Sequence, residues 1–352
     1  MKRTALTFCV LWLAGGLYAL PPTEIIAYVD TAVESSGNGS SWFEAYKTSA
    51  ECEEASQQDL TDNGGNQFIV YCRGTDSTSV TISGWTTAEG MGITWMADPE
   101  QSYALAVVGD YALRINEEFV TIQGMTVTSF ATDDGQQPIY IYTLNSPNSI
   151  EIDACIVAGS DNDAYSQTCV YSADADTNLT IRNSLLFDAG NNAQSYGLAG
   201  GWATATLESV TIANCDKGLY GVGDRVTTGT NVLISRDLVD GAYCWPSGAE
   251  YVRTYSATND ATADANGGDG NRASQTFDFV NEAGNDYQIT VNDTGAKGYG
   301  LDRSASYTTD LLGDTRSVPW DIGAYMYERP SEFVVIVTTD GAERWTLWRM
   351  EP

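Results

Sequence analysis

The segment IEIDACIV, residues 150–157, alternates apolar and polar side chains and then bends, which is typical of a β-strand with one buried face. The pattern recurs as VTIQGMTV (120–127), LTIRNSLL (179–186), ATLESVTI (205–212) and, in shorter form, GTNVLI (229–234). Aligning the repeats brings together two series of positions: Ile122, Ile152, Ile181, Leu207 and Gly229 in one, and Val127, Val157, Leu186, Ile212 and Ile234 in the other. Such a unit cannot bury its apolar face alone, so we expect the repeats to stack.

A second set of apolar stretches lies between these strands, among turns rich in Asp, Asn, Gly and Ser: PIYIY (138–142), TCVYSA (168–173), YGLAGG (196–201) and GLYGVG (218–223). Together the two sets predict an all-β fold, a right-handed parallel β-helix in which each repeat forms one coil and loops absorb the variable spacing. A propeller or sandwich fits less well, because few two-residue hairpin turns are present.

Both ends of the predicted solenoid carry elements of their own. The segment 41–58 has the helical apolar spacing Trp42, Ala45, Tyr46, Ser49 and Ala50, which predicts a short helix that caps the N-terminal end. Near the C-terminus, FVVIV (333–337) and RWTLWRM (344–350) predict a β-hairpin that turns at Asp340 and Gly341.

Two flanking motifs resemble those of a known group. YVDTAVESSGNGSSWFEAY (28–46) is similar to the start of many exported right-handed β-helix proteins, and DLLGDTRSVPWDIGAYMYE (310–328) is similar to their closing Asp-Ile-Gly-Ala segment. The resemblance is to the broad pectate-lyase-like superfamily and covers residues 28–328. Met326 departs from it, since an acidic residue often stands there. The group contains polysaccharide lyases, bacterial surface proteins and phage appendage proteins, so the resemblance implies a fold more than an activity.

The closing motif itself is expected to be structural. We expect Arg316 to pair with Asp314 or Asp321, Gly323 to allow a close backbone approach, and Trp320, Ile322 and Tyr325 to cover the last coil.

The N-terminal residues 1–19 have the form of a secretory signal, with Lys2 and Arg3 before an apolar run and cleavage expected after Ala19. This predicts an extracellular or cell-surface protein with the β-helix at 28–328, a hairpin extension at 329–352 and no membrane span after cleavage. The formal net charge of −30 argues against a nucleic-acid partner. A homo-oligomer, for example a trimer formed through the terminal hairpin, is left open.

Six cysteines follow the signal, which is an even number and favours disulfides in an exported chain. Pairing between neighbours in the sequence is the expectation, namely Cys52–Cys72, Cys155–Cys169 and Cys215–Cys244. The alternative is that they are free thiols buried in the core.

The chain contains no histidine, which excludes Ser-His-Asp and Cys-His catalysis and histidine-ligated zinc. Carboxylate, Lys, Arg and Tyr chemistry remains, and Lys217 and Asp188 are the catalytic candidates if the protein is an enzyme. Asp153, Arg182 and Glu208 share one register and are expected to line up on an outward face as alternating charges.

No cofactor is required by this reading, although Asp-rich turns offer calcium candidates at Asp161, Asp163, Asp264 and Asp269. Aromatic residues accompany the second strands and their loops, and about half should point inward: Tyr140, Tyr142, Tyr165, Tyr171, Tyr196, Trp202, Tyr220, Tyr243 and Trp245. From these, the candidates for glycan contact are Tyr142, Trp202, Tyr220 and Trp245.

The sequence therefore favours an exported, non-catalytic β-helix scaffold that contacts a polysaccharide or a cell-surface glycan or takes part in adhesion. A polysaccharide lyase or glycoside hydrolase is the alternative. A phage tail or fibre component is a further alternative, which the signal sequence disfavours.

Overall fold

The computed structural model describes residues 22–62, 65–142, 148–160, 165–190, 195–221, 226–235, 251–260, 268–327, 333–339 and 342–348. The predicted signal segment lies outside these ranges. Within them, no helix is both long enough and apolar enough to cross a membrane.

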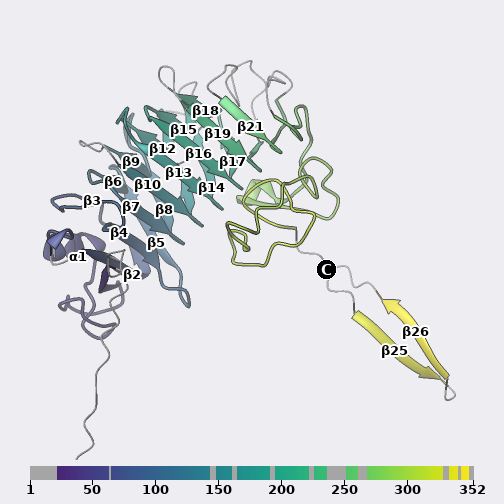
Figure 1. Ribbon diagram of the computed structural model, residues 1–352, viewed down its shortest axis with the longest axis horizontal. Helices are drawn as coiled ribbons and strands as arrows, with labels where there is room; N and C mark the ends of the chain where they lie inside the picture. The colour runs from purple at the N-terminus through teal and green to yellow at the C-terminus, as the bar shows by residue number, and fades with distance from the viewer. Residues whose placement is uncertain are drawn as a thin grey trace, which may run out of the picture.

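The chain forms a right-handed parallel β-helix whose coils follow one another from β2 to β21 (Figure 1). Its strands make three parallel faces, which we call sheets I, II and III. Sheet I contains β1 (Thr23–Asp30), β2 (Asn66–Asp76), β4 (Ile93–Ala97), β7 (Val120–Gln123), β10 (Ser149–Asp153), β13 (Asn178–Arg182), β16 (Thr204–Glu208), β19 (Val226–Thr230) and β21 (Tyr251–Thr254).

Sheet II begins with the second half of β2, so that sheets I and II form one 16-stranded sheet that bends at this strand. It continues through β5 (Tyr103–Val108), β8 (Thr126–Phe130), β11 (Ile156–Ala158), β14 (Leu185–Gly190), β17 (Thr211–Cys215), β20 (Leu233–Ser235) and β22 (Ala257–Thr258). Sheet III contains β3 (Val80–Ile82), β6 (Leu113–Ile115), β9 (Ile139–Ile141), β12 (Thr168–Ser172), β15 (Tyr196–Gly200) and β18 (Lys217–Gly221).

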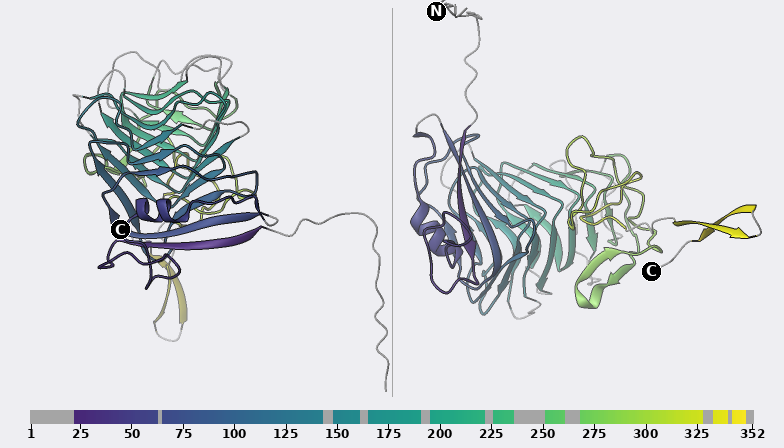
Figure 2. Two further views of the ribbon diagram at one scale, coloured as in Figure 1. Left: turned by 90° about the vertical axis from the view of Figure 1, so that its left-hand side faces the viewer. Right: turned by 90° about the horizontal axis from the view of Figure 1, so that it is seen from below.

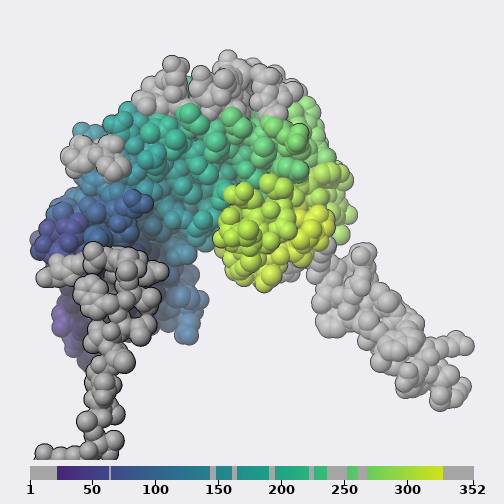
Figure 3. Space-filling model, in the orientation of Figure 1, coloured from purple at the N-terminus to yellow at the C-terminus, as the bar shows by residue number. Residues whose placement is uncertain are grey.

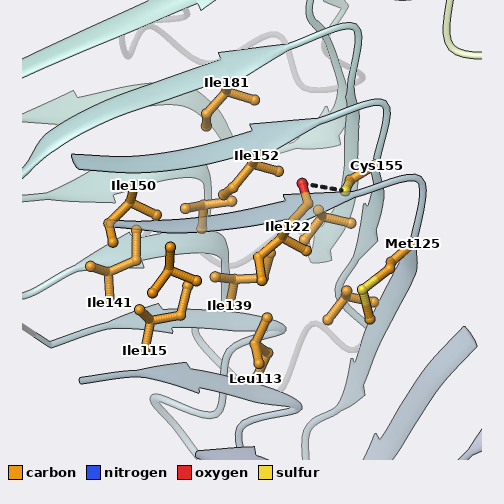
Figure 4. Packing of buried hydrophobic residues seen from close by; sticks show 14 of the residues in the cluster. Leu113, Ile115, Ile122, Met125, Ile139, Ile141, Ile150, Ile152, Cys155 and Ile181 are labelled. Carbon is orange, nitrogen blue, oxygen red and sulfur yellow. Dashed lines mark hydrogen bonds between the residues drawn. The ribbon is translucent and has the colours of Figure 1, made fainter. Parts of the chain in front are cut away.

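The predicted alignment of the repeats is the observed register. Ile152 is paired with Ile122 on one side and with Ile181 on the other, and the series continues to Leu207 and Gly229. On sheet II the second apolar series is likewise in register, from Val127 to Ile234. These side chains point into the space between the sheets, where Figure 4 shows the isoleucines of neighbouring coils stacked on one another. Like-on-like stacking of branched side chains buries the apolar face that a single coil would leave in water.

The corner between sheets I and II is a single residue in the left-handed conformation. Gly124, Ala154, Asn183, Ser209 and Asn231 occupy this position in successive coils, with φ between 46° and 67°. The N–H of each donates to the carbonyl of the last sheet I strand residue of the next coil, as from Ala154 to Arg182 (3.0 Å). The corner therefore continues the hydrogen-bond ladder across the turn, which accounts for the small and amide residues that the repeats place there.

The N-terminal end of the stack is covered by α1 (Ser49–Ser56), which lies across it in Figure 2. The helix is shorter than its apolar spacing suggested, because Thr48 and Glu51 form a capping box that starts it at Ser49. Residues before the cap join the sheet instead, since Tyr46 forms a bridge with Val29. Inside the cap, the Ser49 N–H donates to Asp76 Oδ2 at 2.7 Å.

Residues 268–327 form a lobe that lies against the outside of sheet II (Figures 1 and 3). It contains β23 (Phe279–Asn281), a 3₁₀ turn (Glu282–Gly284) and β24 (Asp286–Ile289). The closing motif follows, and its Ala324 and Tyr325 pack with Leu185, Phe187 and Ala213 of sheet II. Ile322 packs with Leu233 of β20 and Ala257 of β22, the last two strands of sheet II. The motif therefore covers the last coil, as expected, but from the side, and it also covers the coils before it.

Gly323 makes the expected close approach. Its φ is 109°, its N–H donates to the Asn231 carbonyl at 2.8 Å, and a Cβ there would stand 2.7 Å from Thr211 Oγ1. Arg316 departs from the expectation. Its guanidinium donates to the carbonyls of Gly323 and Ala324, while Asp310 and Asp321 act on it through their charge.

The C-terminal strands β25 (Phe333–Thr339) and β26 (Ala342–Trp348) pair antiparallel, as the predicted hairpin requires. The turn residues between them lie outside the described ranges.

The predicted disulfides are wrong for the cysteines that the structure describes, all of which are free and buried: Cys52, Cys72, Cys155, Cys169 and Cys215. Cys155 and Cys169 face different carbonyls, those of Ile122 (3.5 Å) and Phe187 (3.3 Å). Cys155 follows the corner residue Ala154 between sheets I and II, whereas Cys169 lies in β12 of sheet III, so these two neighbours in the sequence do not form a pair. Cys244 lies outside the described residues.

Candidate functional site

The outward side chains of sheet III form a ladder that is mostly aromatic. Arg114 is paired in register with Tyr140, Tyr140 with Tyr171, Tyr171 with Ala199, and Ala199 with Tyr220. Neighbouring parallel strands lie about 4.8 Å apart, so residues in register on successive coils form a row across the sheet. Period-two alternation sets their direction, because Ile139 and Ile141 on either side of Tyr140 are fully buried.

The rings in the first part of this row are stacked. Tyr140 and Tyr171 lie 5.6 Å apart between ring centroids with an interplanar angle of 11°. Tyr111 packs on Tyr140 at 4.6 Å, and Tyr142 stacks beside it at 6.3 Å. The Arg114 guanidinium carbon lies 5.5 Å from the centre of Tyr140 and 5.4 Å from that of Tyr142. One end of the row is therefore an aromatic platform with a cation among its rings.

The other end repeats the arrangement two coils further along. Tyr196 and Tyr220 are stacked at 5.0 Å, and Lys217 Nζ lies 5.2 Å from the centre of the Tyr196 ring. Asp216 Oδ2 is 3.9 Å from the same Nζ. We call the whole set the tyrosine face, comprising Tyr111, Arg114, Tyr140, Tyr142, Tyr171, Tyr196, Lys217 and Tyr220.

The surroundings of two of these phenols, Tyr140 and Tyr196, favour the neutral form. Burial raises the pKa of Tyr140 and the neighbouring Tyr111 and Tyr171 add to the effect, while Arg114 opposes it. Burial also raises the pKa of Tyr196, together with Tyr220 and Asp216. The face thus presents uncharged rings with hydroxyl donors, and its two cations stand out in a strongly acidic chain.

Two of the predicted glycan-contact residues belong to this face. Tyr142 is 39% exposed and Tyr220 is 47% exposed. Trp202 does not belong to it and the prediction was wrong, because its side chain has no exposed surface and its Nε1–H donates to Thr227 Oγ1 at 3.1 Å inside the coil. Trp245 lies outside the described residues.

The two catalytic candidates occupy different surroundings. Lys217 begins β18 and is part of the tyrosine face. Asp188 lies within β14 of sheet II, where the register with β17 shifts, and it has φ 55° and is buried. Its carboxylate accepts from Asn214 Nδ2 at 2.6 Å and from Asn285 Nδ2 at 2.7 Å. These contacts link two coils to the C-terminal lobe, so the position has a structural reason to hold a carboxylate. A catalytic role for either residue stays a prediction.

The calcium candidates are only partly visible. Asp161, Asp163 and Asp264 lie outside the described residues, and Asp269 sits in an exposed turn. In the described part of the chain, no three Asp, Glu or Cys side chains are grouped so as to hold a metal ion. Calcium binding stays a prediction.

The tyrosine face also contains members that sequence reasoning passed over, notably Arg114 and Tyr111. The signal was present in the third strand of each coil, where YALRI, PIYIY and TCVYS each place one outward residue between inward ones. Aligning Arg114, Tyr140 and Tyr171 in this way would have found the row.

Apart from the tyrosine face, a hollow of about 490 Å³ lies on the outside of sheet I. Short polar side chains and Glu151 line its floor, and its walls include Phe119 and the turn at Glu89 and Gly90. The residues that line it are Gln67, Glu89, Gly90, Gly92, Ile93, Thr94, Phe119, Thr121, Asn148, Ser149, Glu151 and Asn178. We call it the sheet I groove.

Beside this groove runs the predicted charge ladder. Asp153, Arg182 and Glu208 are in register. Arg182 bonds to Asp153 at 3.2 Å and also to Glu151, whereas Glu208 is held by Arg303 of the C-terminal lobe. The ladder is thus a paired surface, as expected, rather than a set of free carboxylates.

Comparison with known proteins identifies no family. No family model matches the chain, and no curated protein matches it. Among solved structures, the crystal structure of pectate lyase Pel9A is similar, with a TM-score of 0.45 and 13% identity over 87% of this chain and 97% of that chain. Such a likeness says nothing of activity.

Proposed function

We propose that this protein binds polysaccharide along the tyrosine face and serves as an exported, non-catalytic β-helix scaffold. The observation that carries the proposal is the stacked Tyr140 and Tyr171 pair, on adjacent strands of a rigid sheet, with Arg114 and further tyrosines around it.

The chemistry of sugars supports this choice of ligand. One side of a pyranose ring presents C–H groups that pack on an aromatic ring, while its hydroxyls need donors and acceptors such as a phenol. A row of rings fixed at strand spacing offers several such contacts to an extended chain without ordering a loop, which lowers the entropic cost of binding. Arg114 and Lys217 favour sugars that carry carboxylates.

A binding role agrees with the state of the candidate catalytic groups. Lys217 has Asp216 and the Tyr196 ring as neighbours, and both oxygens of Asp188 accept amide hydrogen bonds. Lyase action remains the second candidate, because a lysine and a tyrosine adjoin on the same face and a proton could be taken from a bound uronate there.

A glycan array combined with an activity screen tests the proposal. The wild-type protein is expected to bind one or more polysaccharides on the array. The affinity of Tyr171→Ala for them should be about tenfold lower, and that of Tyr299→Ala should equal the wild-type value. Tyr299 is the matched control, since it is a tyrosine 45% exposed and belongs to the C-terminal lobe. No release of unsaturated uronides or reducing sugar is expected. If Tyr171→Ala binds the polysaccharide as tightly as wild type, the tyrosine face is not the binding site. If product is released, the protein is a lyase or hydrolase and not a non-catalytic scaffold.

A further inference from the structure

Three buried glutamates converge on the loop 83–87 at the N-terminal end of the stack. Glu53 comes from α1, and Glu117 and Glu118 come from the turn that precedes β7. Their exposed fractions are 3%, 7% and 9%. We call them the carboxyl cluster.

Glu53 holds the loop with one of its oxygens. Oε1 accepts from the Ser83 N–H at 2.8 Å and from Trp85 Nε1–H at 2.8 Å. Oε2 is buried and has no hydrogen-bond partner among the described residues. A carboxylate in this position would leave a charged oxygen unsolvated, whereas a carboxylic acid would not.

The other two glutamates accept hydrogen bonds from later residues of the same loop. Glu117 Oε1 accepts from the Trp85 N–H at 3.0 Å. Glu118 Oε2 accepts from Thr87 Oγ1 at 3.4 Å, and its Oε1 is again buried without a partner among the described residues. Two unpartnered oxygens and three acidic side chains therefore face one short loop.

The groups around the cluster favour its protonated form. Burial raises the pKa of Glu53 to about 7, and the charge of Glu117 adds to this, while the hydrogen bonds from Ser83 and Trp85 and the nearby polar side chain of Gln57 work against it. Burial and Glu118 raise the pKa of Glu117. A further titratable neighbour is Cys52, whose thiol is itself buried beside Glu53. No described Lys or Arg is among the causes that shift Glu53 or Glu117.

The loop that the cluster holds leads directly into a wall of the sheet I groove. After Thr87 the chain turns through Glu89 and Gly90, which line the groove, and Ala88 and Met91 close that turn with hydrogen bonds of 2.8 and 3.2 Å. Phe119, which follows Glu118, is another lining residue. It has φ 54°, and its carbonyl accepts from the Ile93 N–H at 3.0 Å.

We propose that the carboxyl cluster is a pH-sensitive latch, which holds the 83–91 wall of the sheet I groove in mildly acidic solution and releases it above neutral pH. When Glu53 and Glu117 ionise, the two like charges lie close together in a buried place and one oxygen has no donor. Admitting water relieves both problems, and water can enter only if the loop moves away from α1. The groove wall then loses its support.

Hydrogen exchange measured on full-length protein tests the latch. After correction for the intrinsic pH dependence of exchange, a peptide covering 83–91 is expected to exchange at least about tenfold faster at pH 8 than at pH 5 in wild type. Glu53→Gln, which mimics the protonated acid, is expected to remove most of this difference. Glu54→Gln is the matched control, because Glu54 is the next residue of the same helix and is exposed.

Two internal comparisons keep the test decisive. Glu117→Gln should act in the same direction as Glu53→Gln, which guards against a single variant that folds poorly. A peptide covering 178–190, on coils far from α1, should show no comparable change. Equal corrected exchange at pH 5 and pH 8 in wild type, or an equal pH effect in Glu53→Gln, would overturn the proposal.

Discussion

Replacing Arg316 by methionine should loosen the attachment of the C-terminal lobe to the coils. The side chain is 6% exposed, and its Nη2 donates to Ala324 O at 2.7 Å, Gly323 O at 3.1 Å and Asn183 Oδ1 at 3.2 Å. Nε donates to Thr309 O at 3.2 Å. The guanidinium thus joins two parts of the closing motif to the corner of a coil.

The size of the effect follows from these hydrogen bonds. Nη2 has two hydrogens for its three acceptors, so with Nε the side chain makes the equivalent of three bonds. Each bond from a charged donor contributes about 1.5 kcal/mol or more, which gives roughly 4.5 kcal/mol in sum. Part of this is offset because the variant no longer buries a cation, whose desolvation also lowers the pKa of Arg316. We expect a net loss of about 3 kcal/mol in the free energy of unfolding for Arg316→Met.

Urea unfolding followed by tryptophan fluorescence and circular dichroism measures this loss. Arg316→Lys keeps the charge without the planar fork and should fall between wild type and Arg316→Met. Lys47→Met removes the same charge from an exposed site and should change stability by less than about 0.5 kcal/mol. If Arg316→Met also stays within about 0.5 kcal/mol of wild type, the lobe is not held as described.

Three further outcomes follow from the buried groups. The five described cysteines should be inert to a thiol reagent in the native state, since burial raises the pKa of Cys52 and Cys155 to about 12, and all five should be modified in denaturant without reductant. Peptide mapping reports each cysteine separately, and any of the five that stays unmodified in denaturant would restore a disulfide. Stability should fall between pH 5 and pH 8, because the folded state binds a proton at Glu53 up to about pH 7 while the unfolded chain releases it near 4.5. Urea titrations should give a drop of up to about 3 kcal/mol, most of which Glu53→Gln removes; an unchanged drop in that variant would contradict the assignment. Ile152→Ala, at a fully buried stacking position, should lower the free energy of unfolding by about 3 kcal/mol, whereas Thr180→Ala, on the outward side of the next coil, should lower it much less. Equal losses for the two variants in urea unfolding would contradict the stacked core.

The fold was predictable because each coil repeats the same alternation. Ile152 needs an apolar partner above and below, so the sequence repeats that partner, and the register of sheets I and II could be read directly. The single left-handed corner residue, such as Asn183, fixes where one sheet ends and the next begins.

The cysteine pairing and the place of the closing motif could not be predicted in this way. Cys155 and Cys169 are close in sequence, but Cys155 lies between sheets I and II and Cys169 in β12 of sheet III, which depends on loop lengths that carry no periodic signal. The closing motif is held sideways by single contacts, such as Ala324 N–H to Thr211 Oγ1 at 2.9 Å, that join residues far apart in the chain.

The candidate site was partly predictable, less so than the repeats and more so than the cysteine pairing. Tyr142 and Tyr220 were identified by composition and proved to be exposed, whereas Trp202 shares their aromatic character and is buried. Only the register of the third strand separates the two cases, because it shows which aromatic side chains share an outward row. The carboxyl cluster had no sequence signal, since α1 and the turn before β7 meet only in the folded stack.

Side-chain footprinting of the protein with and without its best array glycan tests the central claim most directly. Hydroxyl radicals modify exposed tyrosine rings, and mass spectrometry reports each residue separately. A bound polysaccharide is expected to protect Tyr140, Tyr171 and Tyr220 together and to leave Tyr299 unchanged. Protection confined to the sheet I groove, or no protection of the tyrosine face at saturating glycan, would contradict the account.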